Sequence, residues 1–155
     1  MRKLSLCLAA TLALGACVRT ATNEATGKVD VDVESPTKRG EDWKAGLKGM
    51  GNFASVVGQV KANVMEGRTQ ATISLEGATS GGQHPWMIHE GSCNQPGPAV
   101  GMASDYPLIT VTADGRGSAS ANIMARLDEA KNYVAIVHAS QSDLATIVAC
   151  GDLDD

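Results

Sequence analysis

The stretch RTQATISL, residues 68–75, alternates polar and apolar side chains without a break. Every second residue from Thr69 onward could face a protein core, and the residues between them could face water. Successive side chains of a β-strand point to opposite faces, so this alternation predicts a strand with one buried face. Residues 55–65 and 116–127 show the same period of two.

Turn signals separate these segments. The dipeptides Glu66-Gly67 and Asp114-Gly115 are suited to hairpins, because glycine adopts positive φ at no steric cost. Shorter candidate strands lie at residues 106–112, 133–138 and 146–150, and no alternation of strands with helices interrupts them. Seven or eight short strands separated by turns predict an antiparallel β-sandwich or β-barrel.

The N-terminus has the layout of a secretory signal. Two basic residues precede an apolar run at 4–14 that is too short to span a bilayer as a helix. The run ends in LGAC, residues 14–17, which matches a bacterial lipoprotein signal. We therefore expect a signal peptide over 1–16 and a lipid on Cys17 that anchors the protein to a membrane. The alternative is an ordinary cleavage site that happens to lie near a cysteine.

A polar segment follows, in which Pro36 and several glycines interrupt any regular period. We expect a tether over residues 17–53 and a β domain over residues 54–155. One or two helical turns are predicted within the tether at residues 41–48, around Trp43 and Leu47.

The formal net charge of the chain is -4. Loss of residues 1–16 would remove two basic residues and no acidic one, which argues against nucleic acid as a partner. Val18, rather than an aspartate, follows Cys17. We therefore expect a bacterial cell-envelope protein anchored in the outer membrane and facing the periplasm. Its protein partners and oligomeric state are left open.

The cysteine positions indicate a disulfide. Cys7 would leave with the signal peptide and Cys17 would carry the lipid, so Cys93 and Cys150 remain. In an exported protein, two remaining cysteines most simply pair with each other. The bridge would close a loop of more than fifty residues and stabilise the fold by roughly 4 kcal/mol. Two free buried thiols are the alternative.

The chain holds three histidines, at positions 84, 89 and 138. Residues two apart on a strand share a face, so Met87 and His89 would project together. If the strand that ends at His138 lies nearby, two imidazoles and a thioether could converge, a donor set that suits Cu(I) better than Zn(II). Equally, the histidines could be core or surface residues, and Met87 could be an apolar packing residue.

The segment HPWMIHEGSC, residues 84–93, followed by IVHA at 136–139 and ACG at 149–151, resembles the Cu/Zn superoxide dismutase family. In that family the pattern H-x-x-H-x-H-E supplies one structural histidine and then two copper ligands. The resemblance therefore implies that His84 is structural, that Met87 replaces the first ligand, and that His89 and His138 remain as copper ligands.

The resemblance also implies an eight-stranded antiparallel Greek-key β-barrel, flattened like a sandwich, with a Cys93–Cys150 disulfide. Several family features are missing. The segment that would carry the zinc ligands, residues 94–106, contains no histidine, and Asp105 is a lone carboxylate there. The family's substrate-guiding arginine is replaced by Ile147, and its aspartate that orients the metal ligands by Ser142, with Asp143 next to it.

These differences imply that zinc is not bound, that copper binding is possible, and that dismutase activity is absent or weak, so enzymatic activity itself stays open. Three functions are compatible with the sequence. The chain could be a superoxide-dismutase-like lipoprotein domain with a degenerate metal site. It could be a Cu(I)-binding envelope module that uses Met87, His89 and His138. It could also be a copper-only superoxide dismutase of low activity.

Overall fold

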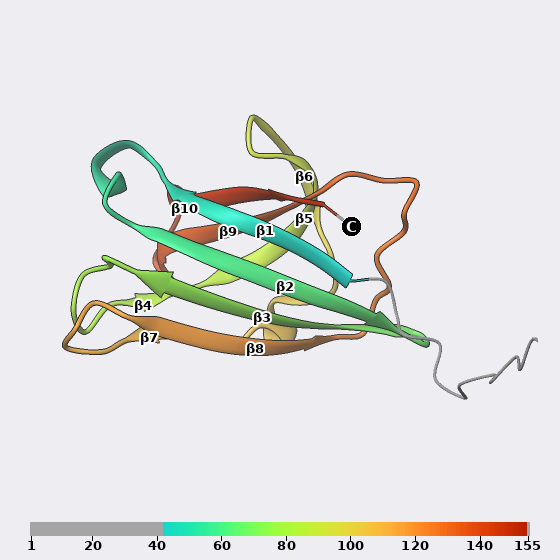
Figure 1. The fold of residues 1–155 in the computed structure, drawn as a ribbon, viewed down its shortest axis with the longest axis horizontal. Coiled ribbons are helices and arrows are strands. Elements are labelled where there is room, and N and C mark those ends of the chain that lie inside the picture. The colour runs from blue at the N-terminus through green and yellow to red at the C-terminus, as the bar shows by residue number, and fades with distance from the viewer. Residues whose placement is uncertain (1–41, 155) are drawn as a thin grey trace, which may run out of the picture. The chain divides into compact units, whose positions relative to one another are not determined.

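The computed structural model describes residues 42–154, over which the chain forms ten β-strands and two short 3-10 helices (Figure 1). The elements are β1 (Asp42–Gly49), η1 (Gly51–Phe53), β2 (Val57–Met65), β3 (Arg68–Glu76), β4 (Gln83–His84), β5 (Trp86–Ser92), β6 (Gln95–Ala99), η2 (Ala103–Asp105), β7 (Ile109–Val111), β8 (Gly117–Ile123), β9 (Tyr133–Ser140) and β10 (Asp143–Leu153). The expected signal peptide, Cys17 and the tether up to residue 41 lie outside the described residues. Within residues 42–154, no helix is long and apolar enough to cross a membrane.

The strands pair antiparallel in one curled sheet, in the order β4-β7-β8-β3-β2-β1-β10-β9-β5-β6 (Figure 1). β4 and β5 belong to one chain segment that is divided at Pro85. His84 pairs with Ile109 of β7, whereas Trp86 pairs with Val137 of β9. The segment supplies β4 at one end of the strand order and β5 next to the other end. The curled sheet forms a half-barrel. The all-β, antiparallel class predicted from the sequence is confirmed.

The inner face of the sheet carries the apolar residues that the alternation predicts. In β3, Thr69, Ala71, Ile73 and Leu75 are all buried, and the residues between them are exposed or half-buried. The core combines such residues from the long strands, and its largest fully buried side chain is Trp86. Burial of this kind stabilises a domain by about 25 cal/mol for each Å² of apolar surface removed from water.

Residues 42–48 do not form the helical turns that the sequence predicts for 41–48. Residues 42–49 form β1, which lies between β2 and β10 in the sheet. Trp43 and Leu47 are buried with Ala45 on the inner face, and the residues between them point to solvent. Trp43 and Leu47 are four residues apart, a spacing that suits both a helix and a strand, and pairing with two neighbouring strands decides between them. Residues 42–49, expected in the tether, therefore belong to the sheet.

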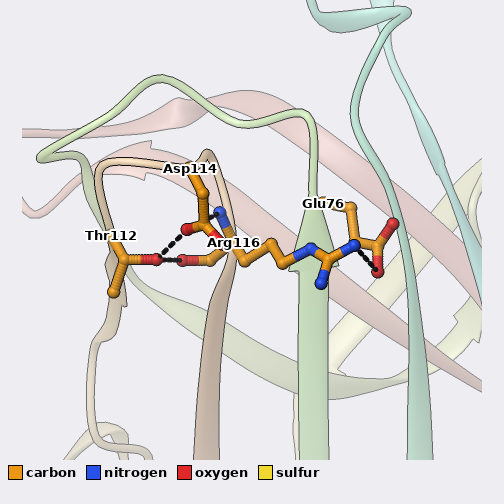
Figure 2. Close-up of polar contacts among 4 residues, drawn as sticks. All are labelled: Glu76, Thr112, Asp114 and Arg116. Carbon is orange, nitrogen blue, oxygen red and sulfur yellow. Dashed lines mark hydrogen bonds and ion pairs between the residues drawn. The ribbon is translucent and has the colours of Figure 1, made fainter.

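The two predicted glycine turns are present. Gly67 has a φ of 73° and Gly115 a φ of 79°, which L side chains rarely adopt. Polar contacts support the turn at Gly115, as Figure 2 shows. The Thr112 hydroxyl lies within hydrogen-bond distance of the Asp114 carboxylate and of the Arg116 carbonyl oxygen, and it lowers the pKa of Asp114. The Arg116 guanidinium also lies 3.6 Å from the Glu76 carboxylate, so this exposed ion pair links the turn to the neighbouring strand β3.

The packing of β1 can be tested with Leu47→Ala. Leu47 is 2 % exposed, so truncation should lower the free energy of unfolding by about 2–5 kcal/mol in urea denaturation. Lys48→Ala changes an exposed neighbour on the same strand and should alter stability by less than about 0.5 kcal/mol. Equal, small effects of the two substitutions would show that β1 does not contribute to the core.

Candidate metal centre

His89 and His138 lie side by side on the outer face of the sheet. The β5–β9 register pairs His89 with Val134 and Met87 with Ile136, and the His138 amide donates to the Pro85 carbonyl at 2.8 Å. The Met87–Ile136 pair thus lies between the two histidines in the register. The imidazoles of His89 and His138 extend toward each other across this pair, with ring centroids 6.3 Å apart and an interplanar angle of 64°.

Three nitrogens of this histidine pair are buried and meet no regular hydrogen-bond geometry with the described residues: Nε2 of His89 and both ring nitrogens of His138. The His138 ring nevertheless lies close enough to the Leu144 backbone for that group to raise its pKa. A buried polar atom without a partner costs roughly 1–3 kcal/mol. Most such atoms in folded proteins find a partner, so a group of three calls for a physical reason. A metal ion bonds an imidazole nitrogen at about 2.0–2.1 Å, so rings at this separation could share one ion only through nitrogens that point toward each other.

Nδ1 of His84 and Nδ1 of His89 each donate a hydrogen bond to a backbone carbonyl oxygen. His84 is buried, and its Nδ1 donates to the His138 carbonyl oxygen at 3.1 Å. His89 donates from Nδ1 to the Gly97 carbonyl oxygen at 3.0 Å. A carbonyl oxygen only accepts, so both bonds place the proton on Nδ1. His84 thereby ties the β4 end of its segment to β9, beside the histidine pair.

Met87 is half-buried and packs against the main core. This is the apolar role that the sequence allows for it. Its place on β5, two residues from His89 and opposite Ile136, also puts a thioether on the same strand face as the histidine pair. Its part in metal binding as a soft third donor stays a prediction.

Burial lowers the pKa of His138 from its ordinary value of 6.5, and the neighbouring His89 acts in the same direction. Asp143 and the Leu144 backbone oppose this shift. The neutral form of the imidazole is therefore favoured, and it is the form that binds metal ions.

Asp143, whose charge acts on His138, accepts a hydrogen bond from the Thr146 amide at 3.0 Å. Asp105 belongs to η2, which contacts β8, and accepts a hydrogen bond from the Met102 amide at 3.0 Å. The residue paired with His138 on β10 is Ile147, which supplies no positive charge. Within the described part of the chain, no three His, Cys, Asp or Glu side chains are placed to hold a metal ion together.

The predicted disulfide is present between Cys93 and Cys150, with Cα atoms 5.9 Å apart. Val134, Ile136 and Cys150 form a small buried cluster on the outer face of β9 and β10, with Cys93 and Ile147 packed against it. We call these five residues the disulfide cluster. It lies beside the histidine pair, because Ile136 is opposite Met87 and Val134 is opposite His89.

Two contacts near the pair have no counterpart in the sequence prediction. The Gly97 carbonyl belongs to β6, a strand that the prediction lacks, and the Asp152 carboxylate accepts the Cys93 amide hydrogen at 2.7 Å. A backbone carbonyl cannot be predicted from residue type, because every residue has one. Asp152 could be predicted to lie near the disulfide, since it is two residues beyond Cys150 and therefore on the same strand face.

No family model matches the chain, and no curated protein matches it.

Replacing both Cys93 and Cys150 by alanine tests the stabilising role of the bridge. The bond links residues 57 apart, so the free energy of unfolding should fall by about 4 kcal/mol in the chain-entropy description. A matched chain with Cys7→Ser and Cys17→Ser keeps the bridge and should unfold at the wild-type urea concentration. A loss below about 1 kcal/mol in the alanine variant would contradict this role.

Proposed function

We propose that this chain is a divergent, superoxide-dismutase-like envelope lipoprotein domain whose remaining metal site binds a single Cu(I) through His89 and His138. Dismutase activity is absent or weak in this proposal. The lipid on Cys17 and the location at the outer membrane belong to it as well, and they rest on the sequence motif alone.

The family assignment draws support from the antiparallel half-barrel and the disulfide. The bridge joins the cysteine that follows His89-Glu90-Gly91 to the cysteine of Ala149-Cys150-Gly151, as the resemblance implies. The motif histidines also lie near one another, since His84 contacts the His138 backbone and His89 lies beside the His138 ring. Segments far apart in the sequence thus meet at one place in the fold.

Copper binding rests on one observation: the adjacent imidazoles of His89 and His138 carry buried nitrogens that meet no regular hydrogen-bond geometry within residues 42–154. Imidazole and thioether are donors that suit Cu(I). Structural zinc sites use four protein ligands and catalytic ones three, which is more than this pair supplies. A bound copper ion would supply one-electron redox chemistry at the site.

Efficient dismutation is disfavoured by the surroundings of the pair. Superoxide is an anion, and the chain has a net charge of -4. Ile147 lies opposite His138 where the resemblance implies an arginine, so no cation at that position attracts the substrate. A thioether in place of one imidazole would also favour reduced copper over oxidised copper. A low-activity copper-only dismutase is the second candidate, and only the retained histidines favour it.

Cu(I) binding can be measured on a chain with Cys7→Ser and Cys17→Ser, which removes competing thiols. Titration against a chromophoric Cu(I) chelator, with ascorbate as reductant, should give one Cu(I) per chain. His89→Ala and His138→Ala should each weaken binding by at least about 100-fold. Met102→Leu removes an exposed thioether, 63 % exposed, and should leave binding unchanged. Less than a tenth of an equivalent bound, or full binding by His89→Ala, would refute the copper proposal.

A dismutase assay after copper loading separates the two candidates. The wild-type chain should add little to the spontaneous rate of superoxide decay. Met87→His supplies a third imidazole and should raise the rate, and adding Ile147→Arg should raise it further by attracting the anion. Met87→Leu is the control for loss of the thioether alone. Rapid turnover by the wild-type chain would contradict a degenerate site, and no gain from Met87→His would count against the family assignment.

A further inference from the structure

The orientation of the His89 ring depends on the β5–β6 hairpin. Its Nδ1 donates to the Gly97 carbonyl on β6, which leaves Nε2 as the nitrogen with a free lone pair. That nitrogen is buried and has no hydrogen-bond partner in the part of the chain that the structure describes. A shift of β6 would therefore change both the direction of the ring and the nitrogen that carries the proton.

β6 is a weakly held edge strand. All five of its residues are exposed, it lies at the end of the strand order, and Pro96 and Pro98 have no amide hydrogen to donate. Its pairing with β5 is interrupted by an irregularity between His89 and Gly91. Position 91 requires glycine, because its φ is 99° and a Cβ there would lie 2.4 Å from the Gln95 carbonyl oxygen.

The turn of this hairpin is fixed to β10 at Cys93. The Cys93 sulfur bonds to Cys150, and the Cys93 amide donates to the Asp152 carboxylate at 2.7 Å. Cys150 and Asp152 are two residues apart on one strand, so both attachments come from the same strand face. A disulfide alone leaves rotation about its bonds, whereas a second, charge-assisted bond to the adjacent amide restricts the turn further.

We propose that Asp152 is a positioning residue for His89: by accepting the Cys93 amide hydrogen it fixes the β5–β6 hairpin, and the hairpin holds the His89 ring with Nε2 directed to the metal site. This inference deepens the proposed Cu(I) function and rests on it for the identity of the ion. Asp152 itself is exposed and touches the hairpin turn, not the histidine pair.

The tautomer of His89 gives a test without metal. Long-range ¹H–¹⁵N spectra of the full chain at about pH 8, where imidazoles are neutral, distinguish the two ring nitrogens. Wild-type His89 should carry its proton on Nδ1. Asp152→Ala should give a mixture of tautomers or a broadened ring signal, whereas Asp152→Asn keeps an acceptor oxygen and should restore the wild-type spectrum.

Cu(I) affinity is the second measurement. Asp152→Ala should weaken binding by about tenfold, the lower end of the range for residues that orient metal ligands, and Asp152→Asn should recover most of it. Asp154→Ala is the matched control. It removes the same charge two residues further along the chain, just after β10 ends, where Asp154 contacts Lys44 through backbone atoms, and it should leave both readouts unchanged.

The two proposals fail in different ways. A wild-type chain that binds no Cu(I), but whose His89 spectrum changes in Asp152→Ala, would refute the copper function and keep the positioning role. A His89 proton on Nε2, or a wild-type spectrum and affinity in Asp152→Ala, would overturn the positioning role. Equal losses in Asp152→Ala and Asp154→Ala would also overturn it, because they would point to negative charge alone.

Discussion

The antiparallel register of β5 against β9 is the constraint on which both the core and the candidate metal centre depend. In this register Trp86 and Ile88 enter the core, while Met87 and His89 lie on the outer face. Because the side-chain period of a strand is two, a slip of one residue would exchange the faces. It would bury His89 in the core and place Trp86 in water. Thus the burial of Trp86, the largest fully buried side chain, also orients the histidine pair.

Much of the sheet was predictable because its strands carry the period-two pattern and its turns carry glycine. β1 and β6 were not. In β1 the four-residue spacing of Trp43 and Leu47 also fits a helix, and only its neighbours β2 and β10 decide the conformation. β6 contains Pro96 and Pro98, which normally argue against a strand, and it forms because an edge strand can leave one row of donors unpaired.

The residue types at the candidate metal centre were readable from the sequence, but their orientation was not. Two histidines on different strands could be placed on one face only once the β5–β9 pairing was known. The groups that orient His84 and His89 are backbone carbonyls, of His138 and Gly97, and any residue type supplies one. Long-range contacts such as the one between Cys93 and Asp152 depend on the curvature of the whole sheet.

If the pair binds copper as proposed, its electrostatics favour a monovalent ion independently of donor softness. The donors available are neutral: two imidazoles, with burial lowering the pKa of His138, and the thioether of Met87. The cost of moving an ion from water into a buried site rises steeply with its charge, and neutral ligands offset it only in part. The Asp143 carboxylate, which acts on His138, stays ionised and would offset part of an ion's positive charge. A divalent ion would keep more uncompensated charge there than Cu(I). The same imbalance would stabilise reduced copper against oxidised copper, which opposes the cycling that dismutation requires.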